Sequence, residues 1–196
     1  MIANALPVLR EDPVMARLIE RHDPYEEPDW TAYERLCISI IYQQLSTASA
    51  AAIRERVFEL VDGELTPEAV LEAETDALRA AGLSGQKIEY LRNAGRAFIK
   101  NDYTRTGLAD CSNAEVVDQL TEIKGVGEWT ARMYLLFVLR RPDILPLGDL
   151  AVRRGIEQLY GDGEELTRAE MRSIAEQWRP YRSVATRYIW ADYESD

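Results

Sequence analysis

The chain has 196 residues, enough for one ordinary domain or two small lobes around a shared core. No apolar run approaches the ~18 residues of a membrane span, and the N-terminal stretch lacks the basic leader of a signal peptide, so we expect a cytoplasmic protein that binds no membrane. The net charge of −11 argues against DNA binding, and two distant cysteines (Cys37, Cys111) with one histidine (His22) exclude a zinc site, an iron–sulfur cluster and a His-centred triad.

Helical periodicity runs through the whole chain. Apolar residues recur at i, i+3, i+4 and i+7, and no stretch alternates with the period of two that a half-buried strand shows. Capping-box spacings at Ser112 and Thr167 and the proline after Thr66 mark helix starts, while Gly82 and Gly107 mark helix ends. The fold class is therefore all-α, with helices expected at 13–21, 31–42, 46–61, 67–73, 75–81, 85–100, 113–122, 128–140, 149–160, 168–178 and 181–192.

The hairpin, residues 120–132 (LTEIKGVGEWTAR), predicts two helices joined by a tight turn. Gly125 and Gly127 permit positive φ and leave the N–H groups of the turn bare of side chains. These N–H groups precede a helix N-terminus, which favours an anion, and Lys124 adds a cation beside them. On glycines alone, the segment is either an ordinary helix corner or a site for a DNA phosphate.

The complete string LxxIxGVGxxTA resembles the helix–hairpin–helix motif, which contacts the DNA backbone without reading sequence. The resemblance implies a sodium or potassium ion held by the backbone carbonyls of Thr121, Ile123 and Val126. It also implies DNA contacts from the residues of the turn and of the following helix, Lys124, Gly125, Val126, Gly127 and Thr130.

Asp149 follows the hairpin in the segment DILPLGDLAVRRG, at the start of an expected helix. Aspartate is a favoured N-cap, so its position alone indicates a capping residue. With the hairpin upstream, the segment resembles the Gly/Pro-rich loop that ends in the catalytic aspartate of the helix–hairpin–helix (HhH-GPD) DNA glycosylase superfamily. The resemblance implies that Asp149 is catalytic and that it faces a DNA-binding cleft between two helical lobes.

Two further stretches resemble the 3-methyladenine DNA glycosylase II branch of that superfamily. Residues 40–52 (IIYQQLSTASAAA) are similar to its QQxS-type turn, although Tyr42 replaces a small residue, and residues 175–190 (AEQWRPYRSVATRYIW) are similar to its C-terminal signature. The matches cover most of residues 31–190, without the N-terminal sheet domain of some relatives. We expect one glycosylase unit over residues 1–196, with lobe A at about 46–140 and lobe B at about 1–45 and 141–196.

The implied activity is base-excision repair of alkylated, 3-methyladenine-type bases in damaged double-stranded DNA, by a monomer that needs no cofactor. Hydrolysis of the N-glycosidic bond builds positive charge on the sugar, which a carboxylate stabilises while it positions or deprotonates the attacking water. An alkylated purine is already cationic and leaves readily, so no strong general acid is required. An abasic site remains.

The target base must first leave the duplex, at a cost of roughly a few kcal/mol. Leu45, beside Gln44 at the tip of the turn after helix 31–42, is our candidate for an apolar wedge that fills the gap. Aromatic rings stack on a cationic base, and the candidates are Trp129 and Trp190, which match pocket positions of the family, and Tyr42. The alternative for each is a core residue, the role expected for the two remaining tryptophans, Trp30 and Trp178.

Three alternatives stay open. A helix–hairpin–helix module without catalysis shares the hairpin but releases no base. A bifunctional oxidised-base glycosylase carries a Schiff-base lysine two residues after the last hairpin glycine, where this chain has Trp129. A helical protein–protein adaptor leaves the hairpin and Asp149 unexplained.

The charge is unevenly distributed along the chain. Residues 120–160 carry six basic residues against five acidic ones, whereas residues 1–30 carry three against seven. Only Lys87, Lys100 and Lys124 are lysines among the 23 basic residues. Such a composition predicts adaptation to high salt, where counterions screen self-repulsion, and the alternative is an ordinary acidic protein from an arginine-biased genome.

Overall fold

The computed structural model describes residues 2–162 and 164–195, and every regular element within these residues is a helix. The predicted all-α fold is therefore confirmed. The chain forms two compact units, unit 1 from Met1–Pro28 with Arg140–Asp196, and unit 2 from Asp29–Leu139. This division differs from the expected lobes, because residues 29–45 belong to the same unit as the helices that follow them. No helix in the described part of the chain is both long and apolar enough to cross a membrane.

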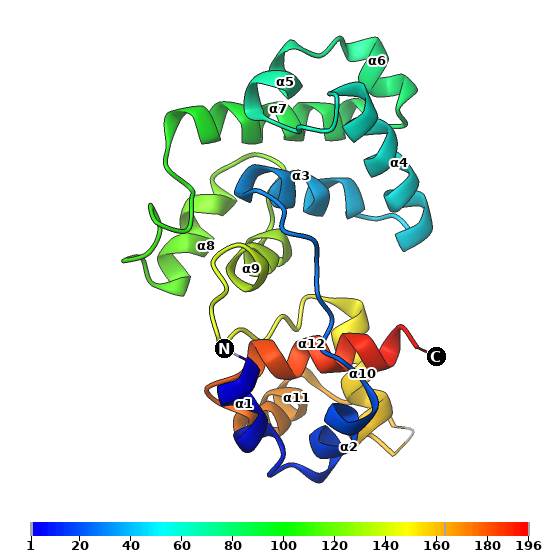
Figure 1. Ribbon diagram of the computed structural model, residues 1–196, viewed down its shortest axis with the longest axis vertical. Helices are drawn as coiled ribbons and strands as arrows, with labels where there is room; N and C mark the ends of the chain where they lie inside the picture. Colours follow the sequence, from blue (N-terminus) through cyan, green and yellow to red (C-terminus); the bar gives the residue numbers. More distant parts are fainter. Residues whose placement is uncertain (1, 163, 196) are drawn as a thin grey trace. The chain divides into compact units, whose positions relative to one another are not determined.

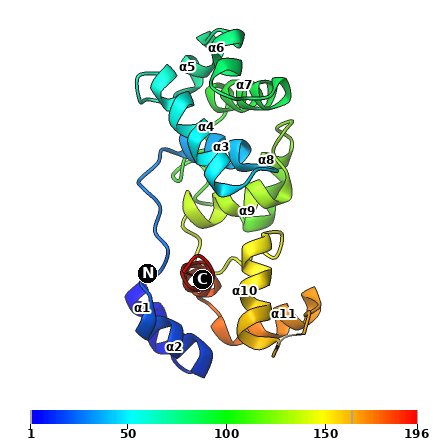
Figure 2. The ribbon, with the colours of Figure 1, turned by 90° about the vertical axis from the view of Figure 1, so that its right-hand side faces the viewer.

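Unit 1 is organised around α12 (Arg182–Tyr193), which buries seven of its 12 residues. Figure 2 shows α12 end-on, with α1 (Ile2–Leu9) and α2 (Pro13–Arg21) on one side and α10 (Leu150–Tyr160) on the other. α11 (Arg168–Ala175) continues directly into a short 3-10 helix, η1 (Glu176–Trp178). A helix buried on most of its faces must be surrounded by other elements, which agrees with the central place of α12 in unit 1.

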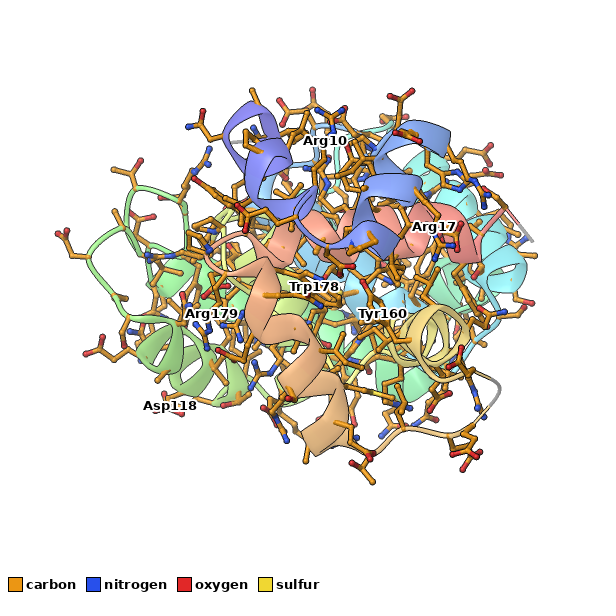
Figure 3. The ribbon with its side chains drawn as sticks, turned by 90° about the horizontal axis from the view of Figure 1, so that it is seen from below. Arg10, Arg17, Asp118, Tyr160, Trp178 and Arg179 are labelled. Carbon is orange, nitrogen blue, oxygen red and sulfur yellow. The ribbon has the colours of Figure 1, made fainter. Side chains whose placement is uncertain are left out.

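The core of unit 1 contains Trp178, which is fully buried as predicted. Its indole Nε1 donates to Oδ2 of Asp12 at 3.0 Å, and the Tyr160 hydroxyl donates to the same oxygen. The rings of Tyr160 and Trp178 lie next to each other, with centroids 5.9 Å apart (Figure 3). The other Asp12 oxygen caps α2 by accepting from the N–H of Val14 at 2.9 Å. One buried carboxylate thus ties α2, α10 and η1 together.

In unit 2, α3 (Ala32–Tyr42) lies between α7 (Gly85–Lys100) and α9 (Glu128–Phe137), as Figure 1 shows. Eight of the 11 residues of α3 are buried, so α3 is the central helix of this unit. The remaining helices pack around these three, namely α4 (Thr47–Leu60), α5 (Pro67–Glu72), α6 (Thr75–Ala80) and α8 (Asn113–Thr121). Trp30, expected in the core, is instead half-buried against the ring of Phe58.

Short polar side chains start most of the helices. The N-cap side chains that accept from the first turn are Asp12, Thr31, Ser46, Thr66, Ser84, Ser112, Asp149 and Thr167. The capping boxes predicted at Ser112 and Thr167 are both present.

Two helix predictions need correction. α1 was not among the predicted helices, yet it forms with Pro7 inside it and buries Ala5 and Leu9. α9 ends at Phe137 instead of residue 140, and Arg140 adopts a positive φ of 52° that a helix cannot accommodate.

Candidate active site

The hairpin connects α8 to α9 and depends on a glycine at one position in particular. Gly125 has a φ of +106°, and a Cβ added there would lie 2.2 Å from the Tyr90 ring. Gly127 is the N-cap of α9, and a Cβ at that position would meet nothing within 4 Å. As a glycine, Gly127 makes no side-chain cap hydrogen bond at the start of α9. Anion binding at this helix start stays a prediction.

Val126 and Thr130 contribute to the hairpin through packing. Val126 is 5% exposed and its N–H donates to the carbonyl of Ile123 at 2.9 Å, which closes the turn. Thr130 is 1% exposed, and its hydroxyl accepts a hydrogen bond from Gln43. Contacts of these two residues with DNA would therefore involve backbone groups.

The carbonyls expected to bind a monovalent cation belong to the same short stretch. Thr121 is the last residue of α8 and is exposed, while Ile123 and Val126 are buried in the turn that follows. The carbonyl of Ile123 already accepts from Val126, but a carbonyl oxygen has a second lone pair for a cation. The donor chemistry fits a sodium or potassium ion, and the cation stays a prediction.

Lys124 is paired with a carboxylate. Its ammonium lies 2.7 Å from Oε1 of Glu89, and both side chains are exposed. The hydrogen bond and the charge of Glu89 raise the pKa of Lys124, so the lysine stays protonated. A phosphate that binds Lys124 must therefore share it with Glu89 or displace Glu89.

The wedge turn, residues 43–46, connects α3 to α4. Gln44 has a φ of 58°, a left-handed conformation that is uncommon for a residue with a side chain. Leu45 follows it and is 40% exposed, one of four large apolar residues exposed in the described chain. Ser46 then caps α4 by accepting from the N–H of Ser49. The structure thus places an exposed leucine at the tip of a tight turn, where an apolar wedge requires it.

Asp149 is half-buried and is both a helix cap and the acceptor of a second hydrogen bond. Its Oδ1 accepts from the N–H of Val152 at 3.0 Å and from the indole Nε1 of Trp190 at 3.2 Å. The loop that carries it is held by Arg153, whose guanidinium donates to the carbonyls of Leu147 and Asp149. Two donors on one oxygen fix the orientation of the carboxylate plane.

Trp190 is 7% exposed, and its ring contacts Tyr25, a residue that sequence reasoning missed. The rings of Tyr25 and Trp190 meet edge-to-face with centroids 6.0 Å apart. The Tyr25 backbone is held by Arg187, whose carbonyl accepts from its N–H and whose Nε donates to its carbonyl. Tyr25 lies in a loop without helical periodicity, so no pattern in the sequence singles it out.

A second carboxylate lies close enough to Asp149 to respond to its charge. Burial, and then the charge of Asp149, raise the pKa of Glu194 above its usual value. Glu194 is the C-cap of α12, and its N–H donates to the carbonyl of Trp190. Glu194 thus adds a second carboxyl group near Asp149, while the guanidinium of Arg153 lies at the backbone carbonyl of Asp149.

The other two aromatic candidates belong to unit 2. Trp129 is half-buried in the first turn of α9. Tyr42 is half-buried at the end of α3, and its hydroxyl lies 3.5 Å from Nη1 of Arg54, whose guanidinium also lies over the ring of Trp30. The structure therefore groups Asp149 with Trp190 in unit 1, and the hairpin with the wedge turn, Trp129 and Tyr42 in unit 2.

The structure thus contains a glycine hairpin between two helices and an oriented aspartate at the start of a helix, the two features on which the resemblance to helix–hairpin–helix DNA glycosylases rests. The chain belongs to the HhH-GPD superfamily of base excision DNA repair proteins, whose family model matches residues 37–180. The family resemblance seen in the sequence is thereby confirmed.

Individual relatives match most of the chain. DNA-3-methyladenine glycosylase 1 of Schizosaccharomyces pombe is 33% identical over 185 residues, which are 90% of this chain and 78% of that protein. The structure of the S. pombe 3-methyladenine DNA glycosylase (Mag1) in complex with abasic DNA matches with a TM-score of 0.85 at 30% identity, over 95% of this chain and 94% of that one. A DNA-3-methyladenine glycosidase from Bacillus halodurans matches with a TM-score of 0.78 at 35% identity, over 95% of this chain and 87% of that one.

Proposed function

We propose that this chain is a monofunctional DNA-3-methyladenine glycosylase that removes alkylated bases from damaged double-stranded DNA and leaves an abasic site. Similarity to the S. pombe and B. halodurans enzymes over most of the chain supports the activity. The observation that carries the mechanism is the hydrogen bonding of Asp149, whose Oδ1 accepts from both Val152 and Trp190.

The chemistry follows from that carboxylate. As the N-glycosidic bond breaks, its electron pair leaves with the base and neutralises the positive charge of an alkylated purine. The sugar acquires the positive charge, which the ionised Asp149 stabilises. A water molecule then forms a bond to the sugar carbon and gives its proton to Asp149 or to solvent. Trp190 and Arg153 serve this step by holding the carboxylate and its backbone in place.

The absence of strand cleavage is inferred from the lysines. The chain has Trp129 at the position of the Schiff-base lysine of bifunctional relatives. Lys124, the lysine of the hairpin, precedes the glycines, is held by Glu89 and has a raised pKa, whereas a nucleophilic amine must be deprotonated. Both observations favour a hydrolytic enzyme.

Replacing Asp149 by Asn tests the mechanism. Asparagine caps a helix as well as aspartate does but carries no charge, so we expect base release from methylated duplex DNA to fall about 10²-fold or more with the fold intact. Asp12→Asn is the matched control, because Asp12 also caps a helix and accepts from a tryptophan in unit 1. It should lower the melting temperature and leave the rate per folded molecule unchanged.

Two results would contradict the proposal. A near wild-type rate for Asp149→Asn would reduce Asp149 to a helix cap. Wild-type protein that binds methylated DNA but releases no base, at low or high salt, would favour the non-catalytic DNA-binding module.

A further inference from the structure

We propose that Gln43 and Lys87 are positioning residues that hold the wedge turn against the hairpin, and that base extrusion depends on this link. The inference rests on the proposed function, since it concerns the step that precedes hydrolysis. All the contacts that carry it lie within unit 2.

Gln43 connects the two DNA-contacting segments directly. Its side-chain Nε2 donates to the carbonyl of Gly125 at 3.0 Å and to the hydroxyl of Thr130 at 3.1 Å. An amide nitrogen has two N–H groups, so each acceptor receives one of them. Gly125 lies in the turn of the hairpin and Thr130 in the first turn of α9, and Gln43 therefore fixes the wedge turn to both parts of the hairpin.

Lys87 binds the backbone at the start of the same turn. Its ammonium donates to the carbonyls of Ile41 and Gln43, at 2.5 and 2.8 Å. These carbonyls lie at the C-terminus of α3, where carbonyls lack intrahelical partners and the helix dipole is negative. Lys87 is half-buried where it makes these two bonds, and the burial lowers its pKa.

The helix that carries Lys87 also supports the hairpin. Tyr90 lies one turn further along α7 and packs under Gly125, where a Cβ would meet its ring. The side chain of Asn93 donates to the carbonyl of Lys124 at 3.3 Å, and Glu89 binds the ammonium of the same lysine. Residues three or four apart share one side of a helix, so this part of α7 carries both the wedge turn and the hairpin.

The place of Gln43 in the chain, directly before the wedge, explains how the link affects base extrusion. Gln43 is followed directly by Gln44, in its left-handed conformation, and by the exposed Leu45. A change in the orientation of Gln43 therefore moves the wedge, while the backbone donors of the hairpin keep their place on α7 and α9. We expect Leu45 to fill the gap in the base stack only when its turn is held in place beside the hairpin. Loss of the link should leave DNA binding in place and weaken extrusion.

The test compares excision of one alkylated base from duplex DNA, where it is paired, and from a single strand, where it is already unstacked. Gln43→Met removes both hydrogen bonds at similar side-chain length, and we expect the single-turnover rate on the duplex to fall about 10-fold or more. The rate on the single strand and the affinity for undamaged duplex should change less than about twofold. Lys87→Met should show the same split, and Lys87→Arg should restore the duplex rate, because a guanidinium can also donate to two carbonyls.

Exposed residues provide matched controls. Lys100→Met removes the same charge from the exposed end of α7, and Gln177→Met makes the same amide-to-thioether change on the surface of unit 1, so both should behave as wild type. If Gln43→Met does not fold, Thr130→Val removes one acceptor while filling the same volume, and a smaller loss on the duplex alone is expected.

Equal losses on the two substrates, or a loss confined to affinity for undamaged duplex, would overturn the inference. The proposed function fails separately, when the wild-type protein releases base from neither substrate. In that case a fluorescent base analogue beside the lesion still reports extrusion. A fluorescence increase in the wild type that Gln43→Met reduces would support the link, and an equal increase in both would refute it.

Discussion

Replacing Trp190 by Phe isolates one hydrogen bond of the proposed active site. The change removes the indole N–H that donates to Asp149 Oδ1 at 3.2 Å and keeps an aromatic ring beside Tyr25. A hydrogen bond to a charged group contributes about 1.5–3 kcal/mol, and each 1.36 kcal/mol of barrier changes a rate tenfold, which gives a loss of about 10- to 150-fold. The bond is long and the carboxylate half-buried, so we expect the lower end, about 10-fold.

The matched control is Trp178→Phe. Trp178 makes the same kind of bond in the same unit, from its indole Nε1 to Asp12 at 3.0 Å, and it takes no part in the proposed chemistry. Single-turnover excision with saturating enzyme gives the rate, and a melting curve gives the stability of each variant. Trp178→Phe should lower the melting temperature and leave the rate of the folded protein unchanged. A wild-type rate for Trp190→Phe, or equal rate losses in both variants, would refute the orienting role of Trp190.

The remaining predictions concern DNA binding and charge. Leu45→Ala should slow excision of paired alkylated bases about 10-fold, spare single strands and keep the melting temperature, because Leu45 is exposed; equal losses with a lowered melting temperature would sink the wedge assignment. Borohydride during turnover should trap no covalent adduct, because Trp129 stands where a Schiff-base lysine would, and a trapped adduct would show a bifunctional enzyme. Glu89→Gln should tighten binding to undamaged duplex a few-fold at low salt by releasing Lys124, and unchanged affinity would show that the pair does not compete with phosphate. Stability should rise with salt, since 34 acidic residues oppose 23 basic ones, whereas a melting temperature that is highest at low salt would remove the prediction of salt adaptation.

Local signals made most of the fold predictable. The capping boxes at Ser112 and Thr167 satisfy backbone N–H groups within four residues, so their effect is written in short stretches of sequence. α1 was not predicted from the sequence. Its stability comes from the burial of Ala5 and Leu9 in the rest of unit 1, which outweighs the unfavourable effect of Pro7 on a helix. The grouping of residues 29–45 with unit 2 was equally invisible, because it depends on which helices α3 packs against.

In the candidate site, too, some residues could be predicted from local sequence, whereas their contacts depend on how the helices pack. Gly125 could be found from sequence because a turn needs it, but its close neighbour Tyr90 could not, since that contact depends on how α7 packs. The pairing of Lys124 with Glu89 and the contact of Tyr25 with Trp190 join residues far apart in the chain. A sequence pattern identifies residues whose role depends on their own backbone, such as the glycine of a turn. The side chains that contact these residues become known only from the packing of the helices.

The acidic composition and the DNA-binding hairpin are compatible once the ion pairs are considered. Lys124 is paired with Glu89, and Arg132 is paired with Glu128 at 2.7 Å, so two cations of the hairpin are largely neutralised by their neighbours. We propose that a phosphate at the hairpin is attracted mainly by the peptide dipoles at the start of α9, which are fixed and release no counterions of their own. Affinity that comes from lysine and arginine falls steeply with salt because each phosphate contact displaces a counterion. A hairpin that relies on backbone donors loses less, which suits a chain whose fold is expected to need salt.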